Sequence, residues 1–137
     1  MADMGEHVFN YAIMPHNGDY IEANTVREGY QFNVPLTAEV VSKSSGSLPV
    51  EQSFFSVDAD NVILETVKRA ENDNTTIIRL YECHNRRVDA TVKVNLPFKK
   101  VFETDLLEDN IADIAFEDGQ FTVEFKPFEI KTFKLVS

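Results

Sequence analysis

The chain has 137 residues, with 13 Lys or Arg against 23 Asp or Glu, so its formal net charge is −10. That length suits one ordinary domain, and the negative charge disfavours nucleic acid and membrane surfaces as partners. No run approaches the length of a membrane span, and the first residues lack the pattern of a secretory signal. With Cys83 as its single cysteine, the chain is expected to be cytoplasmic.

The first forty residues predict one helix between two strands. Residues 6–14, EHVFNYAIM, and residues 36–41, LTAEVV, are apolar-rich runs of strand length. Between them, residues 19–32 carry apolar side chains three and four apart and begin with the capping-box spacing of Asp19 and Glu22. The Asn-Val-Pro that follows should end this short helix, because the residue before proline avoids helical dihedrals.

Most of the remaining chain predicts short strands separated by turns. Alternation of apolar and polar residues is cleanest in residues 87–95. Seven strands are expected here, within residues 52–57, 62–70, 75–84, 87–95, 98–104, 120–126 and 128–136. The last of them changes the parity of its apolar residues, which predicts a β-bulge near Lys131 or Thr132. The prediction is a mainly β chain, an antiparallel β-sandwich with one short helix near residues 19–32, forming a single domain over residues 1–137.

Residues 79–87, RLYECHNRR, hold the densest group of reactive side chains. On a strand, Glu82 and His84 share one face, and a carboxylate beside an imidazole is a working general-base pair. No nucleophile or metal-ligand spacing accompanies them, so a structural network in which Arg79 pairs with a buried acid is favoured over catalysis. Cys83 lacks the features of a reactive thiol and is expected in the core.

The turn from His16 to Asp19 puts an imidazole, an amide and a carboxylate on one loop, which suits hydrogen bonding to sugar hydroxyls. A turn with Asp19 as a helix cap explains the same residues more simply. The three histidines, His7, His16 and His84, have no zinc-motif spacing, and the five glycines are scattered singly. The sequence therefore predicts neither a metal site nor a phosphate loop on this chain.

Four stretches together carry a resemblance to a known family. They are DMGEHVFNYAIMPHNGDY, RLYECHNRR, ETDLLED and FKPFEIKTFKL, at residues 3–20, 79–87, 103–109 and 125–135. In this order they resemble the C-terminal β domain of the family 38 glycoside hydrolases, the α-mannosidases. The match spans both ends of the chain, but none of these stretches is a catalytic motif.

The resemblance implies an intact enzyme that hydrolyses α-mannosides with retention, using a zinc ion and a carboxylate nucleophile in a large N-terminal domain. No zinc ligand, nucleophile or acid/base residue of the family has a matching position here. The chain is thus expected to be a fragment without a cofactor of its own, a non-catalytic C-terminal accessory domain whose partner is the catalytic domain.

Two further expectations concern surfaces of this domain. An apolar face should pack on the catalytic domain, so the chain alone should self-associate through that face. The candidates for contact with mannosides at the rim of the pocket are His16, Asp19, Arg79, Glu82 and His84.

Two alternatives remain open. An independent carbohydrate-binding module would need exposed aromatic rings, for which the candidates are Tyr11, Tyr20, Tyr30 and Tyr81. The absence of Trp weakens this alternative. A stand-alone glycosidase would have to turn over an α-mannoside with the 137 residues alone.

Overall fold

The computed structural model describes residues 4–137, and the chain divides between Val40 and Val41 into two compact units. The first unit contains the helix α1 (Thr25–Asn33), and the second contains all the strands that the described residues form. These strands are β1 (Phe55–Val57), β2 (Val62–Arg69), β3 (Thr76–Glu82), β4 (Val88–Val94), β5 (Lys100–Thr104), β6 (Asn110–Ile114), β7 (Gln120–Phe125) and β8 (Ile130–Val136). The assignment of residues 1–137 to one domain stays a prediction.

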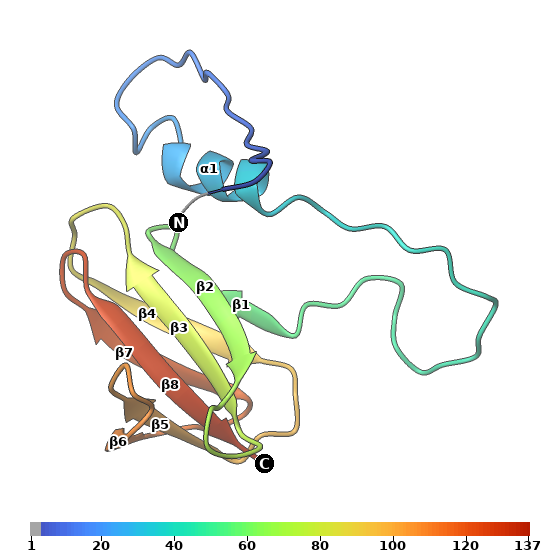
Figure 1. Ribbon diagram of the computed structural model, residues 1–137. Helices are drawn as coiled ribbons and strands as arrows, with labels where there is room; N and C mark the ends of the chain where they lie inside the picture. The colour runs from blue at the N-terminus through green and yellow to red at the C-terminus, as the bar shows by residue number, and fades with distance from the viewer. Residues whose placement is uncertain (1–3) are drawn as a thin grey trace. The chain divides into compact units, whose positions relative to one another are not determined.

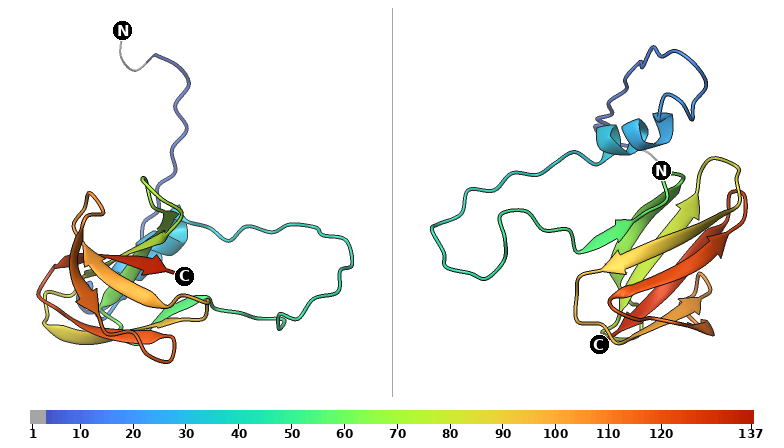
Figure 2. Two further views of the ribbon diagram at one scale, coloured as in Figure 1. Left: turned by 90° about the horizontal axis from the view of Figure 1, so that it is seen from below. Right: turned by 180° about the vertical axis from the view of Figure 1, so that it is seen from behind.

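The second unit is a sandwich of two antiparallel sheets, which Figures 1 and 2 show stacked face to face. The smaller sheet has the strand order β1-β4-β7, and the larger has the order β2-β3-β8-β5-β6. Every neighbouring pair of strands is antiparallel. The predicted architecture, a mainly β antiparallel sandwich with one short helix, is confirmed.

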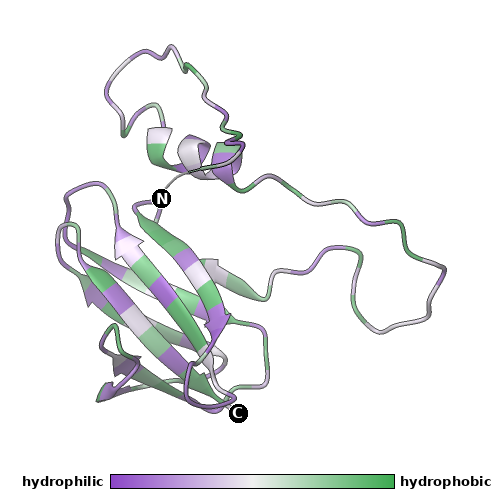
Figure 3. Ribbon diagram, viewed as in Figure 1, coloured by the Kyte–Doolittle hydropathy of each residue, from purple (hydrophilic) through white to green (hydrophobic). Residues whose placement is uncertain are grey.

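The core lies between the two sheets because each strand turns one apolar face inward. In β4 the buried positions are Ala90, Val92 and Val94, which alternate with exposed or half-buried polar residues. The ring of Phe121 in β7 lies with its centroid 5.0 Å from that of Phe133 in β8, so the two sheets meet through aromatic contact. Figure 3 shows the alternation as bands of opposite hydropathy along the strands of the larger sheet.

Residues 116–121 form a tight hairpin connection between β6 and β7. Asp118 and Gly119 both have positive φ, 50° and 71°. The backbone N–H of Gln120 donates to the carbonyl of Glu117 at 2.9 Å, and the reverse bond measures 3.1 Å. A two-residue turn of this kind suits the twist of antiparallel strands, and Asp-Gly is among its preferred sequences.

Three strand predictions were wrong. Residues 6–14 and 36–41 form no strand in the described part of the chain, while β6 forms where none was expected. The bulge expected near Lys131 or Thr132 is also absent, because β8 keeps an unbroken register with β3. In β8 the residues on the core side are Lys131, Phe133 and Leu135, and Ile130 faces outward. The buried apolar residues Phe133 and Leu135 therefore share one face without a bulge.

The helix begins later than predicted. The capping box exists: the carboxylate of Asp19 accepts from the backbone N–H groups of Ile21 and Glu22 at 2.8 and 2.9 Å, and the N–H of Asp19 donates to the Glu22 carboxylate at 3.2 Å. Asn24 then takes a left-handed φ of 52°, so the first turn is interrupted and α1 starts at Thr25. No helix of residues 4–137 is long and apolar enough to cross a membrane.

Candidate functional site

Three loops meet around the carboxylate of Glu82, the last residue of β3. Its Oε1 accepts from the side-chain amide of Asn61 at 2.9 Å and from the backbone N–H of His84 at 2.7 Å. Its Oε2 accepts from the backbone N–H of Phe128 at 2.9 Å. These partners belong to the β1–β2, β3–β4 and β7–β8 connections, and the Glu82 residue itself has 0% exposed surface.

The electrostatics of Glu82 favour its ionised form. Burial alone would raise the pKa of this carboxyl group, but the N–H of Phe128, the amide of Asn61 and the N–H groups of His84 and Arg86 hold the pKa below its ordinary value. A carboxylate offers about four acceptor positions, and these four donors use them. Through these bonds Glu82 holds the three loops together.

The other predicted residues of the 79–87 stretch take separate positions. Arg79 lies on the opposite face of β3 from the core and donates from Nε to the hydroxyl of Thr132 at 3.1 Å. The expectation that Arg79 pairs with a buried acid was therefore wrong, because its partner is a neutral hydroxyl. His84 meets Glu82 through its backbone N–H. Cys83 is buried, as expected.

His16 and Asp19 lie in the first unit, three positions apart on an exposed turn. Asp19 acts as the cap described above, and Nδ1 of His16 lies 3.4 Å from the carbonyl of Asn17. Glu82 and His84 are thus the pair of rim candidates that the structure brings together, with Arg79 on the other side of the same strand. Their role at a mannose pocket stays a prediction.

A second buried carboxylate, Glu108, was not among the residues predicted from the sequence. It lies in the β5–β6 loop with a left-handed φ of 72° and is 5% exposed. Its Oε2 accepts the backbone N–H of Glu71 at 2.8 Å, and its Oε1 lies 3.0 Å from Nζ of Lys68. The N–H of Glu71, followed by Lys68, holds the pKa of Glu108 below its ordinary value. Glu108 thereby fastens the β5–β6 loop to the β2–β3 hairpin.

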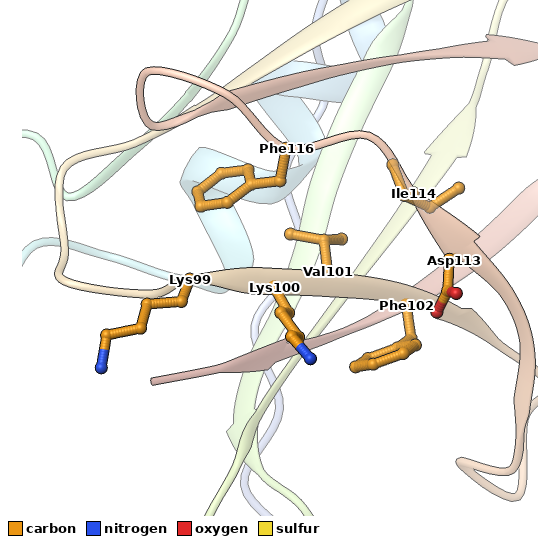
Figure 4. Close-up of a pocket in the computed structure, with 7 residues that line it drawn as sticks. All are labelled: Lys99, Lys100, Val101, Phe102, Asp113, Ile114 and Phe116. Carbon is orange, nitrogen blue, oxygen red and sulfur yellow. The ribbon is translucent and has the colours of Figure 1, made fainter.

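A surface hollow of about 440 Å³ lies beside β5 and β6. Figure 4 shows Val101, Ile114 and Phe116 on one side of β5, and Lys100 and Phe102 on the other. Lys99 and Asp113 complete its lining. The hollow includes none of the predicted site residues, and its lining combines four apolar side chains with those of Lys99, Lys100 and Asp113.

The described residues do not fit a zinc ion. Within residues 4–137 no group of three or more His, Cys, Asp or Glu side chains is arranged to hold a metal. Zinc sites in proteins need three or four such ligands. The two buried carboxylates, Glu82 and Glu108, are already bonded to N–H groups and to Lys68.

Comparison with known proteins places this structure in context. Residues 61–133 match the sequence model of a family described as the glycosyl hydrolases family 38 C-terminal beta sandwich domain. Over 98% of its length, the chain is 38% identical to alpha-mannosidase 2C1 of Mus musculus and 36% identical to alpha-mannosidase 2C1 of Homo sapiens. Over 99% of its length it is 30% identical to alpha-mannosidase G of Dictyostelium discoideum. The chain spans 13% of the length of each of these relatives.

Proposed function

The chain belongs to the C-terminal β-sandwich domains of glycosyl hydrolase family 38, and from this we propose that it serves as a non-catalytic accessory domain of an α-mannosidase. The observation that carries the proposal is one of coverage. Relatives named alpha-mannosidase match 98% of this chain, whereas the chain spans 13% of them. The chain is thus a small part of its relatives, and it is a sandwich whose buried carboxylates hold loops together. Both features support a structural role.

In this proposal the chemistry takes place outside the 137 residues. The intact enzyme hydrolyses α-mannosides with retention, and its zinc ion and nucleophile are held by another domain. The bonding of Glu82 and Glu108 supports this proposal, because both carboxylates are buried and bonded within the sandwich. The catalytic domain of the same enzyme is then the partner of this chain.

The proposal also includes the cellular compartment of the enzyme and the behaviour of this chain when it is separate from the rest of the enzyme. A cytoplasmic enzyme is supported by the use of the single cysteine, Cys83, as a buried apolar residue. Self-association of the separate chain is supported by its exposed apolar side chains, which include Leu106, Leu107 and Ile111 near the edge strand β6.

The test uses the purified chain with zinc added and with an aryl α-mannoside as substrate. We expect no turnover above buffer, and no heat of binding when mannose oligosaccharides are titrated into the chain by calorimetry. Turnover would instead establish a stand-alone enzyme. Saturable binding of the oligosaccharides would favour the carbohydrate-binding module and refute the accessory role as its sole function.

A further inference from the structure

Residues 6–14 have the pattern of a strand but lie in no sheet of residues 4–137. Phe9, Tyr11 and Ile13 occupy alternate positions, so in an extended chain their side chains share one face. These three residues are 78%, 82% and 86% exposed. A row of large apolar side chains with this period is what a sheet buries on one face, yet here the row faces solvent.

Leaving this row in water is unfavourable. An exposed apolar side chain gives up the stabilisation that its burial would provide, and an extended backbone outside a sheet also leaves its N–H and C=O groups to water. Pro15 follows the segment directly, and Gly18 turns the chain with a φ of 74°. The segment therefore has the length of one strand, about 30 Å, and a defined end.

The segment lies outside the sandwich but inside the region shared with the relatives. The family match begins at residue 61, after this segment. The alignments to the mannosidases of Mus musculus and Homo sapiens nevertheless cover 98% of the chain, and therefore include most or all of residues 6–14. The chain spans 13% of those relatives, so most of an intact enzyme lies outside it and can contain the sheet edge that pairs with this segment.

We propose that residues 6–14 form a β-strand that adds to an open sheet edge in the remainder of an intact α-mannosidase, with Phe9, Tyr11 and Ile13 facing the core of that sheet. This inference rests on the proposed function, and it names the part of the chain through which the accessory domain is anchored. Strand addition uses backbone hydrogen bonds for affinity and alternate side chains for specificity.

A second copy of the chain is a poorer occupant. Each copy carries a net charge of −10, so charge repulsion opposes the pairing of residues 6–14 between two copies, whereas the self-association proposed above uses the apolar side chains near β6.

In the experiment, this chain replaces the segment that it matches in alpha-mannosidase 2C1 of Mus musculus, which gives a chimeric enzyme. Hydrolysis of an aryl α-mannoside reports whether the chimera is folded, and hydrogen exchange reports on the backbone amides of residues 8–13. We expect these amides to exchange rapidly in the separate chain, and to slow by on the order of 100-fold or more in the active chimera. Equal exchange in the two would overturn the strand.

A side-chain test accompanies the exchange measurement. In the chimera, the triple variant Phe9→Ser, Tyr11→Ser, Ile13→Ser removes the apolar row, and the matched control Asn10→Ser, Ala12→Ser changes the opposite face. The triple variant should lower the melting temperature of the chimera, while the control should leave it unchanged. Equal melting temperatures for the triple variant and the control would also overturn the proposal.

Two further outcomes distinguish failure of the proposed strand from failure of the proposed accessory function. An active chimera that keeps its activity and stability when residues 1–40 are deleted retains the accessory role and refutes the strand. The sandwich core survives that deletion because it lies wholly within the second unit. A chimera that is inactive with every variant of the chain refutes the proposed function and the strand together. Dimers of the separate chain that disappear with the triple variant would show that a second copy is the occupant.

Discussion

Replacing Glu82 by glutamine asks whether this buried carboxylate holds the loop end of the sandwich. Glutamine keeps the shape of the side chain but removes its charge, and it puts an NH₂ donor in place of one acceptor oxygen. In the structure, Oε1 accepts from Asn61 and from the N–H of His84, and Oε2 accepts from the N–H of Phe128. Whichever oxygen is replaced, at least one N–H loses its acceptor and faces another donor.

The expected loss of unfolding free energy follows from these bonds. A buried N–H without an acceptor costs about 1–3 kcal/mol, and a hydrogen bond to a charged acceptor contributes more than one to a neutral acceptor. One orphaned N–H together with the weakening of the retained bonds amounts to about 3 kcal/mol. For a domain of about 60–100 residues, that loss lowers the melting temperature by roughly 12–24 °C.

The assay is thermal unfolding of Glu82→Gln and wild type, followed by circular dichroism at pH 7. Glu124→Gln is the matched control, since its carboxylate pairs with Arg87 at the surface and its side chain is 53% exposed. Exposed pairs contribute little, so this control should melt close to the wild type. If Glu82→Gln also melts close to the wild type, the carboxylate does not hold the loops.

The pH dependence supplies a second check on Glu82. The pKa of this group lies below its ordinary value of 4.5 in the folded chain. A carboxyl group with a depressed pKa stabilises the fold fully above the unfolded pKa, and this contribution is lost as the pH falls through the folded pKa. The gap between wild type and Glu82→Gln should be widest at neutral pH and should narrow below about pH 4.5. A gap that stays constant down to the acid limit would contradict ionisation of Glu82.

Three further predictions use the same unfolding assays. Phe128→Gly should raise stability by about 0.5 kcal/mol, because Phe128 has a left-handed φ of 57° and a 59% exposed side chain; a lower melting temperature would mean that the ring packs. Phe133→Ala should cost about 3–5 kcal/mol, because this fully buried ring packs on Phe121; a urea midpoint near wild type would contradict that packing. Glu108→Gln should destabilise less than Glu82→Gln, since Glu108 has fewer partners, Lys68 and one backbone N–H; the opposite order would show that the β5–β6 loop is the more important anchor.

The strands of the sandwich could be predicted wherever one face of a strand is buried. In β4 the alternation of valines and polar residues matches the alternation of buried and exposed positions. The same holds for β7, where Phe121, Val123 and Phe125 are buried. Such a pattern is present in the sequence because the pleat places successive side chains on opposite faces.

Apolar-polar alternation predicted strands wrongly in two situations: where a segment alternates but is not paired, and where a strand is paired but does not alternate. Residues 6–14 have the alternation of a strand, but a strand also needs a neighbour, and alternation alone does not say where that neighbour is. The edge strand β6 is the reverse case. It is paired to β5 on one side, yet residues 110–113 are all exposed, so it carries no apolar period to detect.

The role of Glu82 could not be predicted either, because it depends on distant residues. Asn61 is 21 positions away in the chain and Phe128 is 46 positions away, and only the sandwich topology brings both to the end of β3. The spacing of Glu82 and His84 indicated two neighbouring side chains. The structure joins them through the backbone of His84, because β3 ends at Glu82 and the chain turns there.

Two of the stretches that carried the family resemblance contain buried carboxylates that hold loops together. Glu82 lies in RLYECHNRR and Glu108 lies in ETDLLED, and both carboxylates are buried. Glu82 accepts from N–H groups of three loops, and Glu108 is bonded to Lys68 and to the backbone N–H of Glu71. An ionised carboxylate suits this task because it accepts several hydrogen bonds at once and makes each of them stronger than a neutral acceptor would. Similarity at such positions predicts the shape of the loop ends. Under the proposed accessory role, this chain would contribute to an active site through the placement of its loops and of residues 6–14, and the reacting groups would come from another domain.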